Sequence, residues 1–516
     1  MNTRYYTLLL GIMTVMLSSC TDWLTIQPAG KVVLDNYWKS ESDVENVVAA
    51  CYRSMVEENY VKKLIVYGEL RSDNVTMDYT TNQADLTKIN DGNILPTNPY
   101  ASWSEFYQVI NYCNIILHYA PDAQQIDPYF SMAKLNAKMA EVLAIRALNY
   151  FYLVRAFGQV PYITKASLSE AQNFEIAKSS EDVILDGLEA DLIKAEGWAM
   201  TSYGNTASNK GRITKNAIRA LLADIYLWRN KYDECITYCD KVLIDNSLNL
   251  IPADLYTYET VFGIKNSRES IFELQFSATN QTYNDAVNKF YGTYSDVGIL
   301  NPVVGTVCEN KELFDVNSDN QFTDLRRKDY IYGGTSSSKI YYIFKYCGLF
   351  RSESSDGKIY HYYWRDAKSS PANWIIYRLP DIMLMKAEAL VQQGNFLPAL
   401  HLVNTTYMRS HPTIAPADTL NASSFTTKME MEELVLKERQ REFLFEGKRW
   451  FDLMRMARRD SSTDRLLVKV LSKYTANLGE IGSKLKDMNA LYFPISESEL
   501  NANSKLVQNP YYDKEY

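Results

Sequence analysis

Histidine is scarce in this sequence, and so are the motifs of the common enzyme and metal sites. Only four histidines occur among 516 residues: His118, His361, His401 and His411. An HExxH zinc motif, a nucleophile elbow, a P-loop and a glycine-rich dinucleotide fingerprint are all missing. We therefore expect no catalytic residues, no metal and no cofactor.

Positive charge is also limited. The chain carries 54 Lys and Arg against 62 Asp and Glu, which gives a formal net charge of −8. Because phosphate binding requires a basic surface, nucleic acid is not expected as a partner. No run reaches the roughly 20 apolar residues that a membrane-spanning helix needs.

Cysteine is too sparse for a dense disulfide framework in a chain of this size. Six cysteines follow Cys20: Cys51, Cys113, Cys235, Cys239, Cys308 and Cys347. Cys235 and Cys239 share one face of a predicted helix, but no nearby His or second Cys pair completes a zinc site. We interpret them as small buried side chains.

The N-terminus has the pattern of an export signal. Arg4 precedes the apolar run Thr7–Leu17, which is too short to span a bilayer. The sequence Leu17-Ser18-Ser19-Cys20 resembles a bacterial lipobox, which implies cleavage before Cys20 and acylation of that cysteine. Two or three acyl chains give stable anchoring. The alternative is an ordinary cleaved signal with an unmodified cysteine.

Tyrosine is unusually frequent, with 39 Tyr beside 19 Phe and 8 Trp. Its flat ring and polar tip suit half-wetted surfaces and binding sites. The alternative for any one tyrosine is simple packing between helices.

Periodicity predicts a mainly helical protein, in which one helix runs from about Trp103 to Tyr119. Residues 131–157 are apolar nearly all round and predict a buried central helix that Gly158 and Pro161 end. Residues 220–243 and 385–404 share a pattern in which a small residue is followed nine positions later by an aromatic that opens a second helix. These are tetratricopeptide-like helix pairs. They are interrupted by a Tyr-rich insertion at about 247–375, where 270–276 and 339–346 predict strands.

A series of motifs in fixed order resembles the SusD/RagB family along nearly the whole chain. After the lipobox come NYWKSESDVENVVAACYRSM, AIRALNYFYLVRAFGQVPYIT, GRITKNAIRALLADIYLWRNKYDECITYCDKVL, ESIFELQF and WIIYRLPDIMLMKAEALVQQGN. The C-terminal part adds ERQREFLFEGKRWFDLMRMAR and LYFPISESELNANSKLVQNPYY. The most specific elements are EFLFEGKRWFDLMR and the closing QNPYY.

The resemblance implies a signal peptide at 1–19 and one SusD-like domain at 20–516, with its helical scaffold at about 36–246 and 376–516. It implies a non-catalytic outer-membrane lipoprotein, facing the cell exterior and anchored through Cys20. Such a protein captures oligosaccharides or polysaccharides for a SusC-like TonB-dependent transporter. Two alternatives remain open, a surface glycosidase and a tetratricopeptide-type scaffold that binds protein.

The candidate glycan-binding residues lie in two polar stretches. Residues 68–99 predict a long loop, where family members often place sugar contacts. We expect polar contacts from Arg71, Asp73 and Asn74, although Arg71 and Asp73 could instead pair with each other. Stacking faces are expected from Trp103, Tyr283, Tyr291 and Tyr294. Trp103 could instead be a hydrophobic staple. Loss of one such aromatic is expected to weaken binding without lowering thermal stability.

Two charged clusters are interpreted as non-functional. Glu446, Arg449 and Asp452 resemble a catalytic group, but we expect their charges to be satisfied by each other and by nearby backbone. Asp315–Asp319 begins like a calcium loop. Arg326 stands where the closing Glu is required, which argues against that motif.

Overall fold

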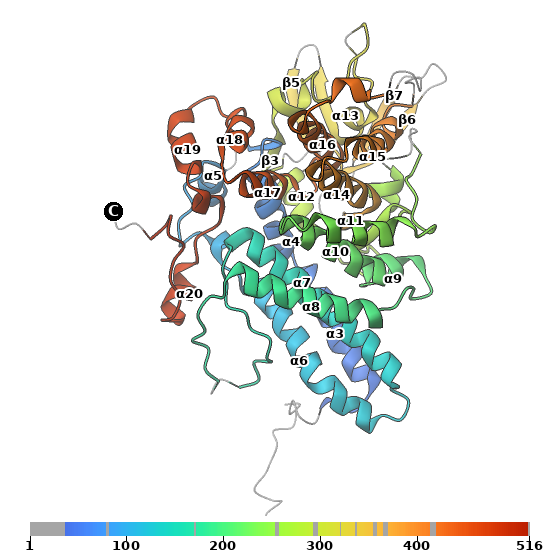
Figure 1. Cartoon of the computed structure of the whole chain (residues 1–516), viewed down its shortest axis with the longest axis vertical. Helices are drawn as coiled ribbons and strands as arrows, with labels where there is room; N and C mark the ends of the chain where they lie inside the picture. Colours follow the sequence, from blue (N-terminus) through green and yellow to red (C-terminus); the bar gives the residue numbers. More distant parts are fainter. Residues whose placement is uncertain are drawn as a thin grey trace, which may run out of the picture.

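The computed structural model describes residues 37–78, 82–169, 172–252, 257, 259–292, 298–319, 321–335, 338–353, 359–364, 370–412 and 419–513. Tyr294 lies outside these residues. The described chain is mainly helical, as the sequence predicts, with short strands between its two helical parts (Figure 1). No described helix combines the length and the apolarity that a membrane span requires.

The first helical part runs to residue 243. Its elements are α3 (Glu41–Met55), α4 (Glu58–Ile65), the π-helix η3 (Val66–Leu70), strand β1 (Val75–Met77), α5 (Ala84–Asn90), the 3-10 helix η4 (Pro99–Ala101), α6 (Ser104–Ile126), α7 (Met132–Phe157), α8 (Glu181–Trp198), α9 (Thr206–Gly211), α10 (Lys215–Trp228) and α11 (Tyr232–Leu243). Capping residues explain where two of these helices start. Ser40 forms a capping box with Asp43 at the start of α3, and the side chain of Ser131 caps α7.

The middle of the chain holds most of the strands. Its elements are η5 (Glu259–Ile264), β2 (Ser270–Leu274), α12 (Asp285–Tyr291), β3 (Leu300–Pro302), η6 (Val304–Cys308), α13 (Leu325–Tyr330), β4 (Ile331–Thr335), β5 (Ser338–Ile343), β6 (Gly348–Glu353), β7 (Ile359–Trp364) and β8 (Trp374–Arg378). The described strands pair antiparallel in twos: β1 with β3, β2 with β8, β4 with β5 and β6 with β7.

The second helical part follows β8 directly. It consists of α14 (Leu379–Gln392), α15 (Phe396–Arg409), η8 (Ala422–Ser424), α16 (Lys428–Phe443), α17 (Arg449–Asp460), α18 (Asp464–Leu471), α19 (Leu478–Leu485), η9 (Met488–Leu491) and α20 (Glu497–Ala502).

The predicted helix pairs are α10 with α11 and α14 with α15. Tyr232 and Phe396 are the first residues of the second helix in each pair. Ala223 and Ala387 are fully buried, so the helices approach closely where the side chain is small. The two pairs also contact each other, because α11 packs against α14 across more than a hundred residues of intervening sequence.

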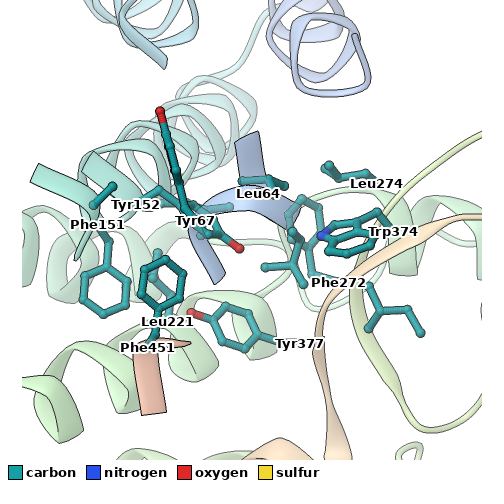
Figure 2. Packing of buried hydrophobic residues seen from close by; sticks show 14 of the residues in the cluster. Leu64, Tyr67, Phe151, Tyr152, Leu221, Phe272, Leu274, Trp374, Tyr377 and Phe451 are labelled. Carbon is teal, nitrogen blue, oxygen red and sulfur yellow. The ribbon is translucent and has the colours of Figure 1, made fainter. Parts of the chain in front are cut away.

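The central helix α7 is buried along its whole second half, from Ala140 to Phe157. Its aromatic residues meet side chains from α4, η3, α10, β2, β8 and α17 in one core, which Figure 2 shows from close by. Gly158 follows with a φ of 74°, a left-handed conformation that ends the helix at the predicted place.

Two expectations about local structure are wrong. Residues 68–99 are no continuous loop, because β1 pairs with β3, and Leu86 and Ile89 bury one face of the short helix α5. Helix α6 does not end near residue 119 but continues through Pro121 to Ile126. Burial of Ala120 and Ala123 offsets the cost of the proline.

Candidate functional site

The polar residues predicted to contact sugar lie in the interior. The guanidinium of Arg71 donates to the carbonyls of Leu491 and Ala490 at 2.7 and 2.6 Å. It also lies over the ring of Trp450, with its carbon 4.3 Å from the ring centroid. All of these contacts join the N-terminal part to the C-terminal part. Arg71 is buried, so these contacts hold its side chain inside the protein.

Asp73 and Asn74 are also buried and bound to other side chains of the protein. The Asp73 carboxylate accepts from the Arg449 guanidinium at 2.8 and 2.9 Å, so Asp73 pairs with Arg449 and not with Arg71. Asn74 donates to Glu69 at 2.7 Å and accepts from Gln440 at 2.9 Å. Sugar binding by these residues stays a prediction, and their positions give it no support.

Neither of the two described tyrosines of the predicted site stacks on Trp103, whose ring contacts are with Tyr107 and Phe157. Tyr291 is 1% exposed, and its hydroxyl donates to the carbonyl of Phe445 at 2.9 Å. Tyr283 is half-buried just before α12. Because Tyr291 and Trp103 (3% exposed) are buried, we now expect their removal to lower the stability of the protein, in contrast to the expectation from the sequence.

The cluster around the α16–α17 junction is a buried ion-pair network. Glu446 binds Arg378 and Lys345, with 2.6 Å between the closest atoms in each pair. Asp452 binds Arg439 and Arg455 at 2.9 Å. None of these partners belongs to the cluster of three, and Arg449 pairs with Asp73. The expectation that the three residues satisfy each other is therefore wrong, and their charges instead fix β8 and the segment after β5 to α16 and α17. This supports the structural interpretation of the cluster.

A hollow with about 1020 Å³ of empty space lies beside Trp103. It is bounded by the N-terminal half of α6, the segment after α7, and α20. The lining residues are Trp103, Ser104, Tyr107, Gln108, Ile110, Asn111, Asn114, Pro161, Ile163, Ser167, Phe174, Glu499, Ala502, Asn503 and Leu506.

Aromatic packing positions Trp103 at the start of α6. Its ring makes edge contacts with Tyr107 and Phe157, at centroid distances of 5.7 and 5.6 Å. Most of the indole is therefore committed to the protein, and only its margin borders the hollow. Trp103 acts mainly as a packing residue, and Tyr107, one helical turn later, extends the aromatic surface.

Amide side chains hold the wall of the hollow in place. Asn111 accepts from the Ser167 N–H at 2.8 Å, and Asn114 donates to the carbonyls of Ile163 and Lys165 at 3.0 and 3.2 Å. From the other side, Asn503 donates to the carbonyl of Ile176 at 2.8 Å. The segment between α7 and α8 is thus tied to both α6 and α20.

Sequence reasoning missed several lining residues that suit a ligand. Phe174 is 50% exposed and lines the hollow, so its ring is accessible to a ligand there. The side chains of Gln108 and Glu499 make no hydrogen bond with the described residues. The available signal was Phe174 itself, a single aromatic within the polar stretch 164–180.

The other large hollows have a different chemistry. One of about 1130 Å³, beside α16, has charged side chains for half of its lining residues, with Phe425 as its single aromatic among the described residues. Another of about 830 Å³, beside α9, has no aromatic in its described lining. The hollow beside Trp103 is therefore the best candidate for a ligand with apolar faces and hydroxyl groups.

Comparison with known proteins gives the family. The model described as the SusD family matches residues 309–512, and a second model, described as starch-binding and associating with the outer membrane, matches residues 22–227. The chain belongs to the SusD/RagB family. The SusD-like protein P38 of Formosa agariphila is 25% identical, and the match covers 98% of each chain.

Solved SusD structures share the fold. A SusD homolog from Bacteroides thetaiotaomicron superposes with a TM-score of 0.75 at 19% identity and covers 92% of this chain and 98% of its own. A laminarin-binding SusD-like protein has a TM-score of 0.68 at 21% identity, over 92% of this chain and 100% of its own. The predicted mainly helical, tetratricopeptide-like fold is confirmed.

Proposed function

We propose that this SusD-like protein captures oligosaccharides at the outer-membrane surface and delivers them to a SusC-like TonB-dependent transporter. Family membership and a laminarin-binding protein of the same fold support a glycan ligand. The observation that carries the proposal is the hollow beside Trp103, where Phe174 and Tyr107 offer rings next to the free amide of Gln108. Sugars present apolar C–H faces and hydroxyl groups, which match this lining.

The charge of the hollow indicates which glycans fit. Among its described lining residues Glu499 is the single one of the Asp, Glu, Lys and Arg types, and it contributes a negative charge. Uronic acids and sulfated sugars would be repelled at short range, whereas neutral sugars pay no such cost. We infer that the ligand is a neutral oligosaccharide.

The same lining favours binding over catalysis. Glycosidases of the usual kind need two carboxyl groups roughly 5–10 Å apart across the scissile bond. The described lining supplies one, Glu499. We propose that the bound glycan leaves the site unchanged.

A screen of neutral and acidic oligosaccharides by calorimetry, run beside a reducing-end assay, tests both statements. The expected result is measurable affinity for a neutral oligosaccharide, weaker affinity for acidic ones, and no new reducing ends. Preferential binding of uronic acids would overturn the assignment of the ligand, and release of reducing ends would favour the glycosidase.

The anchor and the transporter rest on the family and on the lipobox. The Cys20→Ala variant is expected to leave the outer-membrane fraction, while the wild-type chain stays with it. Mild-detergent purification of the wild-type chain is expected to recover a large β-barrel transporter. Recovery of an acylated Cys20→Ala chain, or of wild-type protein that is monomeric even after cross-linking, would contradict these proposals.

A further inference from the structure

The turn between α6 and α7 carries the densest run of exposed apolar side chains near the start of the described chain. Tyr129 is 83% exposed, Ile126 60% and Met132 56%. These three fall within seven consecutive residues, and Tyr129 is the most exposed large apolar side chain among the described residues. Phe130, between them, is buried and fixes the turn to the core. Isolated exposed apolar residues are ordinary, but a cluster of this kind marks a contact surface.

The turn is also a tip of the molecule. Figure 1 shows the connection between α6 and α7 at the lower end of the long axis, away from the strands. Helix α6 holds the hollow at its N-terminal end and the tip at its C-terminal end. A surface bound at the tip would therefore leave the hollow accessible.

The chain enters the described structure beside this tip. Trp38 stacks on Tyr119 of α6, with ring centroids 5.4 Å apart and 9° between the planes. The N–H of Glu41 donates to the Asp127 carboxylate at 2.9 Å, and Lys134 pairs with the Glu41 carboxylate at 2.7 Å. Asp127 belongs to the turn itself. The first described residues are thus held against the α6–α7 turn.

The position of the anchor sets the distance to the membrane. Sixteen residues separate Cys20 from Tyr37. At about 3.3–3.6 Å per residue, the acyl chains lie at most roughly 60 Å from the point where the chain meets the tip. The segment that follows the Cys20 anchor therefore joins the described structure at the tip.

We propose that Ile126, Tyr129 and Met132 form a membrane-contact tip, whose occupant is the lipid surface that holds the Cys20 anchor. This rests on the acylation of Cys20 proposed above. A tyrosine beside two aliphatic side chains suits the boundary between headgroups and acyl chains. The contact restricts the tethered molecule to orientations in which the hollow faces away from the lipid.

Charge contributes little to this contact. Lys134, the cation nearest the tip, is already paired with Glu41, and Asp127 adds a negative charge. The contact therefore depends on apolar burial and is insensitive to salt, unlike a polybasic membrane site.

A fluorescent probe at the tip tests the proposal on the full-length acylated protein. Ala133→Cys places a single reactive thiol at the tip and leaves the three apolar residues intact, since the six described cysteines are buried. Val468→Cys, on the exposed face of α18, is the matched control. Each protein is labelled with an environment-sensitive dye and reconstituted into phosphatidylethanolamine–phosphatidylglycerol vesicles that contain spin-labelled lipid and no transporter.

The tip probe is expected to shift to shorter wavelength and to be quenched by the spin label, in low and high salt alike, while the Val468 probe does neither. In the labelled Ile126→Ser, Tyr129→Ser, Met132→Ser background the shift and the quenching should be lost. Equal behaviour of the two probes would overturn the proposal, as would a shift that appears only when a transporter is added. Mass analysis of Cys20 separates the two hypotheses: an unacylated chain overturns the anchor as well, whereas an acylated chain with an unchanged probe overturns the tip alone.

Discussion

Asp381, at the start of α14, illustrates how single charged residues stabilise this interior. Its carboxylate accepts from Arg439 at 2.9 Å and from Lys448 at 2.6 Å. Burial raises the pKa of Asp381, but the two cations outweigh it and hold the pKa at about 2. A carboxyl group whose pKa is lower in the folded state adds stability above its unfolded value near 3.9 and loses it as the pH falls toward 2.

The variant Asp381→Asn is therefore expected to lose roughly 2–3 kcal/mol of unfolding free energy at pH 7. The difference from wild type should narrow as the pH falls below about 4, because the unfolded wild-type chain then binds a proton at Asp381, whereas the folded protein keeps this carboxylate ionised until the pH nears 2. Urea unfolding of both proteins at pH 7, 5 and 3.5 measures this difference in unfolding free energy. A difference that stays constant over this range would show that Asp381 is not stabilised by its charge.

Trp103 provides a second test at the level of one residue. Because its ring is packed against Tyr107 and Phe157, Trp103→Ala is expected to cost about 3 kcal/mol or more of unfolding free energy. Urea unfolding of Trp103→Ala against wild type measures the loss. An unchanged unfolding midpoint would mean that the indole is a ligand platform and not part of the core.

Residue types alone could not separate binding residues from packing residues. Arg71, Asp73 and Asn74 have the donors and acceptors that a sugar requires, but each has a partner more than 360 positions later in the chain. No local pattern records such contacts. Phe174 was recognisable in principle, because its neighbours in the sequence are polar. Its place beside a hollow was not, because α20, which lies more than 300 residues later, forms one wall of that hollow.

At the level of elements, the π-helix η3 depends on a close backbone approach. A Cβ at Gly68 would lie 1.7 Å from the carbonyl oxygen of Gly447, in the turn between α16 and α17. Gly447 itself has a φ of 69°, which favours glycine. The two glycines let the N-terminal and C-terminal parts touch backbone to backbone.

We expect Gly68→Ala to destabilise the protein by about 2–3 kcal/mol, because η3 must move away from Gly447. The matched control is Gly197→Ala in the last turn of α8, where a Cβ meets nothing within 4 Å. That change should be neutral or add up to about 1 kcal/mol through helix propensity. Thermal unfolding of the two variants checks the contrast, and equal melting temperatures would contradict the close approach.

Local signals predicted elements well where packing agreed with them. Tyr232 and Phe396 open the second helices of their pairs, and Gly158 ends α7. These residues could be recognised because each one influences the backbone within one or two helical turns of its own position. Strand β1 was missed because it is three residues long and exists through its pairing with β3, some 225 positions away. Non-local pairing of this kind leaves little trace in a short window of sequence.

At the level of the whole molecule, buried charges around Glu442 join the second helical part to the middle of the chain. This carboxylate binds Arg378 at 2.5 Å, Arg326 at 3.0 Å, and Arg409, which come from β8, α13 and α15. These cations outweigh the effect of burial and hold the pKa of Glu442 well below its usual value.

The affinity of Phe174→Ala for a neutral oligosaccharide found in the screen tests the central claim most directly. Phe174 is half exposed at the edge of the hollow, and Val507→Ser is the matched control, because Val507 is exposed beside the lining residue Leu506 but does not border the hollow. Phe174→Ala is expected to lose on the order of 1–3 kcal/mol of binding free energy by calorimetry, with an unchanged melting temperature. Val507→Ser should match wild type in both measurements. Wild-type affinity in Phe174→Ala would show that the glycan binds elsewhere and would contradict the account.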